Sequence, residues 1–332
     1  MSPTSRKNGV VGLLAAALAL AGPSHVAAVC PNDLCECLGE AANFRVVSAD
    51  KMTVGSGNVV SSYYPFMIGT FVLDNVEANV CGGTTALLTE PGRDYTEIEG
   101  DLYVLEGPGR TAIRGRILGP ESYPGQTSVV GAKNIATGGG SIVGPVAAIN
   151  TIDTTGTHPG LTRCAQAIAD IQSASQTFAG LTPTQTLGAV IFDDGEQHDI
   201  AVGPGVNVLS ASKLIVKPKK VSRSYLRGTT LQLTLDPATE SVIINASSLY
   251  VGRNCGIVVF GDPTKVVINI VGPGAGPSSG QDAYVAPAIL APERMVRIGP
   301  RGDARAVYGK KVLLRGPYVS QAYNACPFTP LP

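Results

Sequence analysis

The chain has 332 residues and no net formal charge at pH 7, because 25 Lys and Arg balance 25 Asp and Glu. Only 15% of the residues are charged and 44% are hydrophobic, while Gly (40) and Pro (24) are abundant. The chain therefore lacks the excess of positive charge that is typical of proteins that bind nucleic acid or an anionic membrane. The length suits one large β domain or two smaller ones, so it leaves the number of domains open.

The N-terminal residues have the layout of a secretory signal peptide. Arg6 and Lys7 precede an apolar run over 10–21, and small residues follow at 26–28. The run is shorter than the about 20 apolar residues that a membrane-spanning helix needs. We therefore expect residues 1–28 to be a signal peptide, and the mature chain to be secreted without a membrane span.

Seven cysteines are disulfide candidates, because an exported chain meets an oxidising environment. The spacing does not give their pairing, and an odd number leaves one thiol free or bonded to another chain. A zinc site is the alternative, but the two cysteines on either side of Glu36 lack the two-residue gap of zinc knuckles. The candidates are Cys30, Cys35, Cys37, Cys81, Cys164, Cys255 and Cys326.

Short β-forming runs separated by Gly, Pro, Ser and Asn fill most of the chain. A Gly closes such a run at Gly100, Gly115, Gly131 and Gly144, which are 15, 16 and 13 residues apart. A strand and corner that recur at this interval indicate stacked coils, since each coil buries its inward side chains only against the next. The pattern favours an all-β fold of the β-solenoid (β-helix) type over the alternative of a β-sandwich.

Residues 161–179 are the exception, because they contain neither Gly nor Pro and are followed by Gly180. Their apolar residues recur at steps of three and four, which predicts an amphipathic α-helix. A helix of about 19 residues is about 28 Å long, enough to cover about six coils stacked about 4.8 Å apart along one side of the solenoid. The residues at these steps are Leu161, Ala165, Ile168, Ile171, Ser175 and Phe178.

These patterns predict six segments. They are a signal peptide (1–28), a Cys-containing N-terminal segment (29–40), N-terminal solenoid coils (41–160), a flanking helix (161–180), C-terminal coils (181–317) and a Cys- and Pro-containing tail (318–332).

Residues 161–316 resemble two extracellular families, the choice-of-anchor A domains and the ice-binding-like domains. The resemblance implies a β-solenoid with an α-helix packed along it. It also implies a secreted or surface-located protein for the first family, and binding to ice through a flat Thr-rich face for the second. The residues that carry it, besides the helix, are Leu231-Gln232-Leu233-Thr234-Leu235, Ser241-Val242-Ile243-Ile244-Asn245, Val266-Val267-Ile268-Asn269-Ile270 and Ala288-Ile289-Leu290-Ala291-Pro292.

Thr230, Gln232 and Thr234 alternate along one β-forming run, so their side chains should share one face of a strand. They are the candidate surface-binding residues. A weaker row lies between Thr151 and Thr155. We expect neighbouring coils to carry Arg, Lys, Asn or bulky apolar residues at the equivalent positions, which would break a regular Thr array.

Few side chains can act as acids or bases near neutral pH. Beyond the signal peptide the only histidines are His158, in a turn before the helix, and His198. The acidic residues around His198 could bind Ca²⁺, but their spacing fits neither an EF-hand nor a calcium-binding β-roll, and a solvated turn is the alternative. These weak metal candidates are Asp193, Asp194, Glu196 and Asp199. We expect no catalytic residue and no cofactor.

Polysaccharide lyases, which also use parallel coils, are the enzymatic alternative. They need acidic residues for calcium beside a basic residue in the same groove. Lys217, Lys219, Lys220 and Arg223 form one basic turn, without an acidic cluster beside it in the sequence.

Asn245-Ala246-Ser247 is a glycosylation sequon, which has meaning only in a eukaryotic secretory route and only for an exposed Asn.

The expected function is therefore that of a secreted structural or adhesive protein of a cell surface, wall or extracellular matrix, and not of an enzyme. Its partner would be a matrix, wall or surface component. Two alternatives stay open: binding to ice or another crystal surface, and a carbohydrate-active enzyme built on a β-helix.

Overall fold

The computed structural model describes residues 33–44, 46–54, 159–272 and 274–315, and short strands between residues 59 and 153. Within them the chain is mostly β. Strands pair in parallel throughout, except in the short hairpin of β15 (Lys219–Lys220) and β16 (Leu226–Arg227). The parallel pairing rules out the β-sandwich alternative, whose sheets are antiparallel.

The elements follow one another in three groups. The first holds α1 (Leu34–Leu38), the 3-10 helix η1 (Gly39–Asn43), β1 (Val46–Val54), β2 (Val59–Val60), β3 (Val80–Leu87), β4 (Glu97–Ile98), β5 (Leu102–Val104), β6 (Thr111–Ile113), β7 (Arg116–Ile117), β8 (Val129–Gly131), β9 (Ile135–Thr137), β10 (Ser141–Ile142) and β11 (Thr151–Asp153). The second is α2 (Pro159–Gly180). The third holds β12 (Gln185–Phe192), β13 (Gln197–Val202), β14 (Gly205–Val216), β15, β16, β17 (Thr230–Leu235), β18 (Thr239–Ala246), β19 (Leu249–Val251), β20 (Gly256–Phe260), the 3-10 helix η2 (Pro263–Lys265), β21 (Val266–Ile270), β22 (Ser278–Ser279), β23 (Tyr284–Val285), β24 (Ala288–Ile298), β25 (Asp303–Ala304) and β26 (Val307–Leu314).

The parallel pairings stack these strands into coils with three strand positions, which we name the first, second and third face. Long strands cross two of them: β14 pairs with β18 up to Ala211 and with β19 from Leu214 onward. The first face holds β5, β8, β11, β18, β21 and the leading halves of β1, β3, β12, β14, β24 and β26. The second holds β6, β9, β19, β22 and their trailing halves. The third holds β13, β17, β20, β23 and β25, and in the N-terminal coils β2, β4, β7 and β10.

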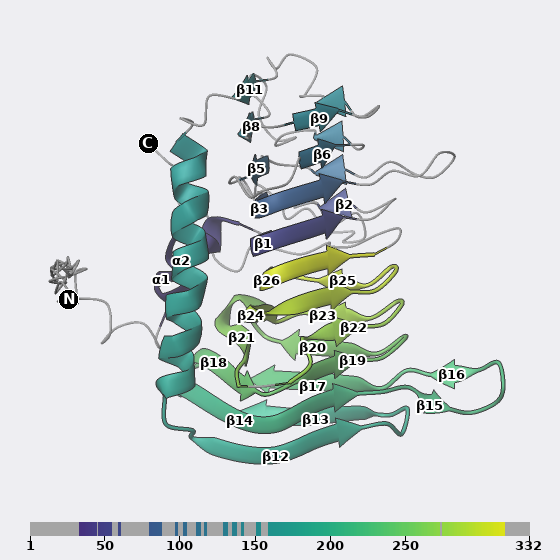
Figure 1. Cartoon of the computed structure of the whole chain (residues 1–332). Coiled ribbons are helices and arrows are strands. Elements are labelled where there is room, and N and C mark those ends of the chain that lie inside the picture. Colours follow the sequence, from purple (N-terminus) through teal and green to yellow (C-terminus); the bar gives the residue numbers. More distant parts are fainter. Residues whose placement is uncertain are drawn as a thin grey trace, which may run out of the picture.

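The first strand of the chain, β1, lies in the middle of the stack. β1 pairs with β3 on one side and with β26 on the other, so the first N-terminal coil lies against the last C-terminal coil. From β1 the strands rise through β3, β5 and β8 to β11 at one end. Helix α2 then runs along the stack, and β12 begins the second half at the opposite end (Figure 1).

The predicted helix is confirmed over Pro159–Gly180, along one side of the coils (Figure 1). Its buried stripe differs from the expected one, because Ala165 is exposed and Ile168 only half-buried. The side chains that it buries are Cys164, Ala167, Ile171, Ala174, Ser175 and Phe178. They pack against outward residues of the first face, among them Val208, Ile243 and Val267. In the described part of the chain, no helix is long and apolar enough to cross a membrane.

A buried polar cluster fastens α2 to the first face. Asn245 and Asn269 are paired in register on β18 and β21. The Asn269 amide donates to Asn245 Oδ1 at 2.8 Å and to the Ser175 carbonyl at 3.0 Å, and Ser175 Oγ donates to Asn269 Oδ1 at 2.7 Å. The Asn245 amide donates to the Phe178 carbonyl at 2.7 Å. The cluster therefore satisfies polar groups that burial would otherwise penalise.

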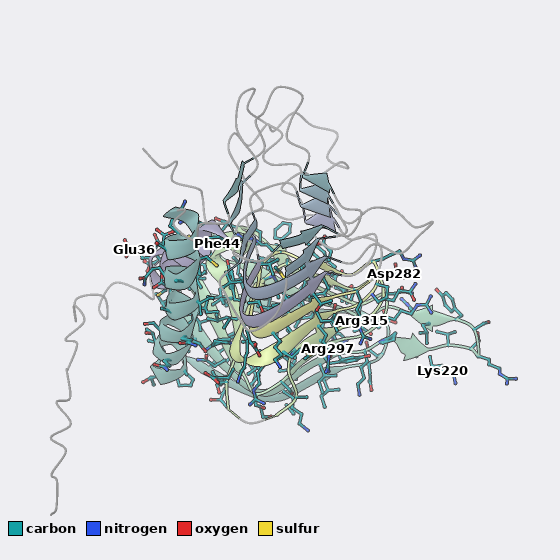
Figure 2. All side chains as sticks on the ribbon, turned by 45° about the horizontal axis from the view of Figure 1, so that its top comes forward. Glu36, Phe44, Lys220, Asp282, Arg297 and Arg315 are labelled. Carbon is teal, nitrogen blue, oxygen red and sulfur yellow. The ribbon has the colours of Figure 1, made fainter. Side chains whose placement is uncertain are left out.

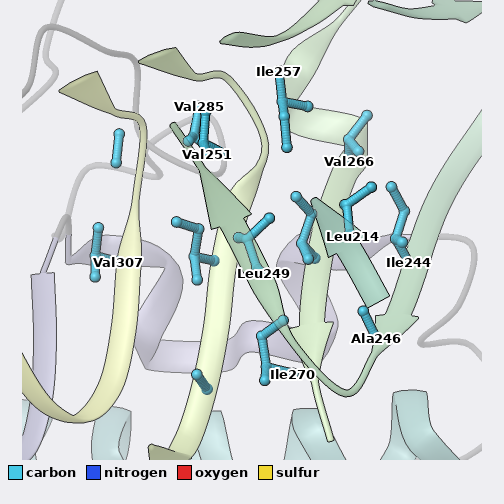
Figure 3. Close-up of a cluster of buried hydrophobic side chains, with 14 of the residues drawn as sticks. Leu214, Ile244, Ala246, Leu249, Val251, Ile257, Val266, Ile270, Val285 and Val307 are labelled. Carbon is cyan, nitrogen blue, oxygen red and sulfur yellow. The ribbon is translucent and has the colours of Figure 1, made fainter. Parts of the chain in front are cut away.

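Inward side chains of all three faces form one continuous apolar core (Figure 3). Ile244 of β18, Leu214 of β14 and Ile257 of β20 are examples from the three faces. Burial of one such side chain stabilises the fold by roughly 1.5–3 kcal/mol. The alternation of inward and outward residues along each strand leaves a row of side chains on the outside of each face.

The corners between the second and third faces are short and closely stacked. Four of them contain four residues each: 193–196, 252–255, 280–283 and 299–302. Gly280 and Gly299 occupy equivalent places in successive corners, where a Cβ on Gly299 would lie 2.6 Å from the Gly280 carbonyl carbon. Only Gly fits such an approach of two backbones, which explains why both of these corners begin with Gly.

The polar cluster yields a stability prediction. Asn269→Ala leaves the buried Asn245 carboxamide oxygen and the Ser175 carbonyl without this donor, so the free energy of unfolding should fall by about 2–3 kcal/mol. Gln176→Ala, on the exposed side of the same helix, should change it by less than about 0.5 kcal/mol. Urea and thermal unfolding of both variants measure the difference, and equal losses would contradict the role of the cluster.

Candidate functional site

The candidate surface-binding residues lie on the third face, in β17. Thr230, Gln232 and Thr234 point outward and are partly exposed, while the intervening leucines are buried in the core. The alternation seen in the sequence therefore places them as predicted, on one side of one strand.

Register shows what flanks this row. Gln197, Asp199 and Ala201 of β13 lie beside it on one side, and Gly256, Val258 and Phe260 of β20 on the other. Neighbouring coils do not repeat the Thr row, as expected, and β20 carries bulky apolar residues there, one of the expected kinds. No Arg, Lys or Asn occupies these positions, and the only bulky apolar residues are on β20. Phe260 is 68% exposed.

Side-chain hydrogen bonds hold the polar row in place. Gln197 Nε2 donates to Asp199 Oδ1 at 3.2 Å and to Gln232 Oε1 at 3.1 Å. Gln232 Nε2 then donates to Thr234 Oγ1 at 3.1 Å. Hydroxyl and amide groups on two adjacent strands thus have fixed positions, beside the apolar surface of Phe260.

The second face is the other open face, and it differs in charge. Its outward residues form a ladder that runs through Ile191, Ile215, Tyr250, Ser278, Arg297 and Leu313. Lys213 and Lys311 flank this ladder. Apolar and cationic side chains therefore both lie on this face, whereas the outward positions of β13, β17 and β20 hold no cation.

The acidic candidates do not converge on a metal site. Asp194 Oδ1 lies 2.8 Å from His198 Nε2, and the His198 ring stacks on Phe192 with the ring centroids 4.1 Å apart. Asp199 is instead held by Gln197 on the third face. No group of three or more potential metal ligands occurs among the described residues. His198 is not a solvated turn residue either, because it lies in β13 and is half-buried against the Phe192 ring.

Glu196 and the basic turn meet in space, although they are separate in the sequence. The basic turn is the β15–β16 hairpin, which replaces one of the short corners. Arg227 forms an ion pair with Glu196 at 3.1 Å, and Gly195 lies against the side chains of Lys219 and Arg227. Sequence spacing gave no signal of this contact, since it depends on the stacking of two coils.

The sequon is buried. Asn245 is 8% exposed and its amide nitrogen, the atom that a glycan would occupy, donates to the Phe178 carbonyl. The folded chain therefore has no room for a glycan there, and the condition of an exposed Asn is not met. The outward face of a strand can meet a helix instead of solvent, and the alternation of residues does not distinguish these cases.

The cysteines divide into two groups. Cys35, Cys37 and Cys164 are disulfide-bonded, whereas Cys255 is a free, buried thiol. Cys255 is therefore not a disulfide residue. Cys30 and Cys326 lie outside the described residues, and the side chain of Cys81 in β3 does too. The same holds for the signal peptide (1–28), His158, Thr155 and the tail (318–332).

Burial raises the pKa of the Cys255 thiol. Because the thiolate is the nucleophile, the native protein should react at Cys255 with iodoacetamide only very slowly at neutral pH, and rapidly once it is unfolded. Peptide mass mapping of alkylation with and without denaturant tests this. Full labelling of Cys255 in the native state would contradict its buried position.

The Asp194 pKa is lowered from its ordinary value of 3.8, first by the hydrogen bond with His198 and then by the Glu196 backbone N–H. Its carboxylate thus stabilises the fold above about pH 3.8, and this contribution disappears as the pH falls through the lower folded-state pKa. Asp194→Asn should therefore reduce the fall in Tm between about pH 5 and about pH 2.5. The exposed Asp193→Asn is the control, and an equal reduction there would contradict this assignment.

Comparisons with known proteins found similar structures only. No family model matches the sequence, and no curated protein matches it. An ice-binding protein of the Antarctic ascomycete Antarctomyces psychrotrophicus is 12% identical, with a TM-score of 0.43 over 85% of this chain and 95% of that chain. One from an Arctic yeast is 15% identical, with a TM-score of 0.45 over 89% and 95%. One from an Antarctic biological consortium is 12% identical, with a TM-score of 0.44 over 85% and 88%.

Proposed function

We propose that this chain is a secreted, non-enzymatic β-solenoid that binds an ordered solid surface through its third face, and that the surface is ice. The observation that carries the proposal is the row Thr230, Gln232 and Thr234, in which side-chain hydrogen bonds hold Gln232 and Thr234, among outward positions of β13, β17 and β20 that carry no cation.

Binding to a solid differs from binding to a soluble ligand, because the protein must match many weak contacts at once. Parallel strands repeat at about 4.8 Å, which sets a regular spacing for outward side chains. The hydrogen bonds around Gln232 restrict its rotamers before binding, so less conformational entropy is lost on the surface. Fixed hydroxyl and amide groups can then hold water molecules in defined positions.

Charge distinguishes the two open faces. Ammonium groups such as Lys213 and Lys311 on the second face are strongly hydrated, and their liquid-like hydration opposes contact with an ordered lattice. The described third face combines Thr and Gln with the exposed ring of Phe260 and with Val258. Release of water from these apolar groups adds a favourable contribution to adsorption.

Secretion is part of the same proposal. Disulfides persist in oxidising compartments, and Cys35, Cys37 and Cys164 are disulfide-bonded. The N-terminal layout of basic and apolar residues would direct the chain out of the cell, where it can meet ice crystals in the surrounding medium.

Thermal hysteresis and ice-recrystallisation assays test the function directly. The unchanged protein should inhibit recrystallisation, and Thr234→Lys should lose at least about tenfold of this activity, because it places a hydrated charge within the row. Ala189→Lys adds the same side chain on an outward position of the second face and should keep the activity.

The outcome of these assays is unambiguous for ice. Absence of any effect of the unchanged protein at high concentration would refute ice binding, and would favour the structural or adhesive role instead. Equal losses in the two Lys variants would refute the third face as the binding surface, provided that both variants keep the Tm of the unchanged protein.

A further inference from the structure

The β15–β16 hairpin is an insertion that the stack of coils does not need. Four equivalent corners join the second to the third face with four residues, but the corner between β14 and β17 takes residues 217–229. Figure 1 shows the hairpin projecting from the coils on the side away from α2. Since the neighbouring coils close without such an extension, its sequence serves something other than the fold.

The base of the hairpin is held firmly between two coils. Thr229 is fully buried; its hydroxyl donates to the Lys217 carbonyl and accepts from the Gly195 N–H of the preceding corner. On the other side, Pro218 closes on Gly252, where a Cβ would lie 2.5 Å from the proline Cδ. The hairpin therefore has a defined direction.

The tip is ordered as well. The Val221 and Ser222 N–H groups both donate to the Tyr225 carbonyl, and the Tyr225 N–H donates to Ser222 Oγ. Despite these bonds the two largest apolar side chains of the tip stay in solvent: Val221 is 55% exposed and Tyr225 58%. This turn is ordered by hydrogen bonds and exposes an aromatic ring, so it is suited to contact with a partner.

Charge is concentrated in the same element. Five of the chain's 25 Lys and Arg lie within residues 217–227, which contain no Asp or Glu, although the whole chain is neutral. Glu196 neutralises Arg227. No ion pair among the described residues involves Lys219, Lys220 or Arg223. Figure 2 shows Lys220 out on the projecting hairpin, away from the body of the coils.

We propose that this hairpin is a docking element for an anionic polysaccharide, one that carries carboxylate or sulfate groups. Lys220 and Arg223 bind the acidic groups, and Tyr225 lies against the apolar face of a sugar ring. A polysaccharide fits because it repeats anionic groups and flat apolar patches along one chain, which matches cations interleaved with one exposed ring. The proposal is independent of ice binding, because it uses a different element.

Two other polyanions fit less well. An anionic membrane would need apolar area to insert, and Val221 with Tyr225 offers little of it. Duplex nucleic acid would need an extended row of phosphate contacts, whereas the unpaired cations here occupy one short hairpin. Both are outcomes of the test below.

Direct binding of the whole protein to polygalacturonate and to heparin, with neutral dextran as control, tests the proposal. At least one of the two polyanions should bind, and the binding should weaken between about 0.05 and about 0.5 M salt as charges are screened. The double variant Lys220→Glu with Arg223→Glu should lower affinity at least about tenfold. Lys213→Glu with Lys310→Glu makes the same change in net charge elsewhere and should alter it less than about twofold.

The ring has its own test. Tyr225→Ala should lower the affinity a few-fold, and Tyr225→Phe should preserve it, because the ring face makes the contact. All variants lie outside the core and should keep the Tm of the unchanged protein.

Three results would overturn the proposal. The first is binding to neither polyanion at low salt. The second is equal weakening by the two double variants, which would mean non-specific attraction. The third is tighter binding to phosphatidylserine vesicles or duplex DNA than to both polysaccharides. Ice assays on the hairpin variants separate the two proposals, since ice activity should survive every hairpin change.

Discussion

The pairing of β1 with β26 joins the beginning of the described chain to its end, and the rest of the arrangement depends on it. Because Val46 lies beside Val307 in register, the N-terminal coils can grow only away from this junction. The chain must then return past the whole stack before the C-terminal coils can grow back toward it. A helix is suited to this return, because 22 residues rise about 33 Å while their backbone groups bond internally.

The return also decides which faces are open. Helix α2 occupies the first face, so outward side chains there meet protein instead of water. This explains why polar residues on that face, such as Asn245 and Asn269, are paired with each other and with the helix. The carboxamide side chains on the third face, Gln197 and Gln232, bond to each other in solvent. The surfaces that can contact a partner are therefore the second and third faces and the corners between them.

Sequence patterns predicted the local features of this structure and missed the distant ones. The Gly-free stretch predicted the helix, and the short β-forming runs predicted strands, because both leave marks within a few residues of one another. The Gly interval of 13–16 residues was not the coil repeat, since Val80 pairs with Leu102 and Leu102 with Val130. The junction of Val46 and Val307 leaves no such mark, since parallel pairing across the chain requires only that both strands be apolar. The two short helices α1 and η1 in the Cys-containing segment were not predicted either.

The same limit explains the fate of the candidate residues. Period-two alternation placed Thr230, Gln232 and Thr234 together, since their shared face is a property of one strand. It could not tell that Asn245 faces a helix, or that Glu196 would meet Arg227, because both depend on which coils are neighbours.

The corner between the second and third faces is where the two proposals meet. The Thr row of β17 begins at Thr230, directly after Thr229, the buried residue that anchors the hairpin. A row of side chains with a regular spacing suits a rigid, repeating surface, whereas a projecting hairpin reaches a flexible polymer. The two elements also differ in charge. The outward positions around Thr230 on the third face hold no cation, whereas the hairpin is rich in Lys and Arg. A chain with both elements on one coil could hold a hydrated polymer and an ordered surface at the same time, without either contact blocking the other.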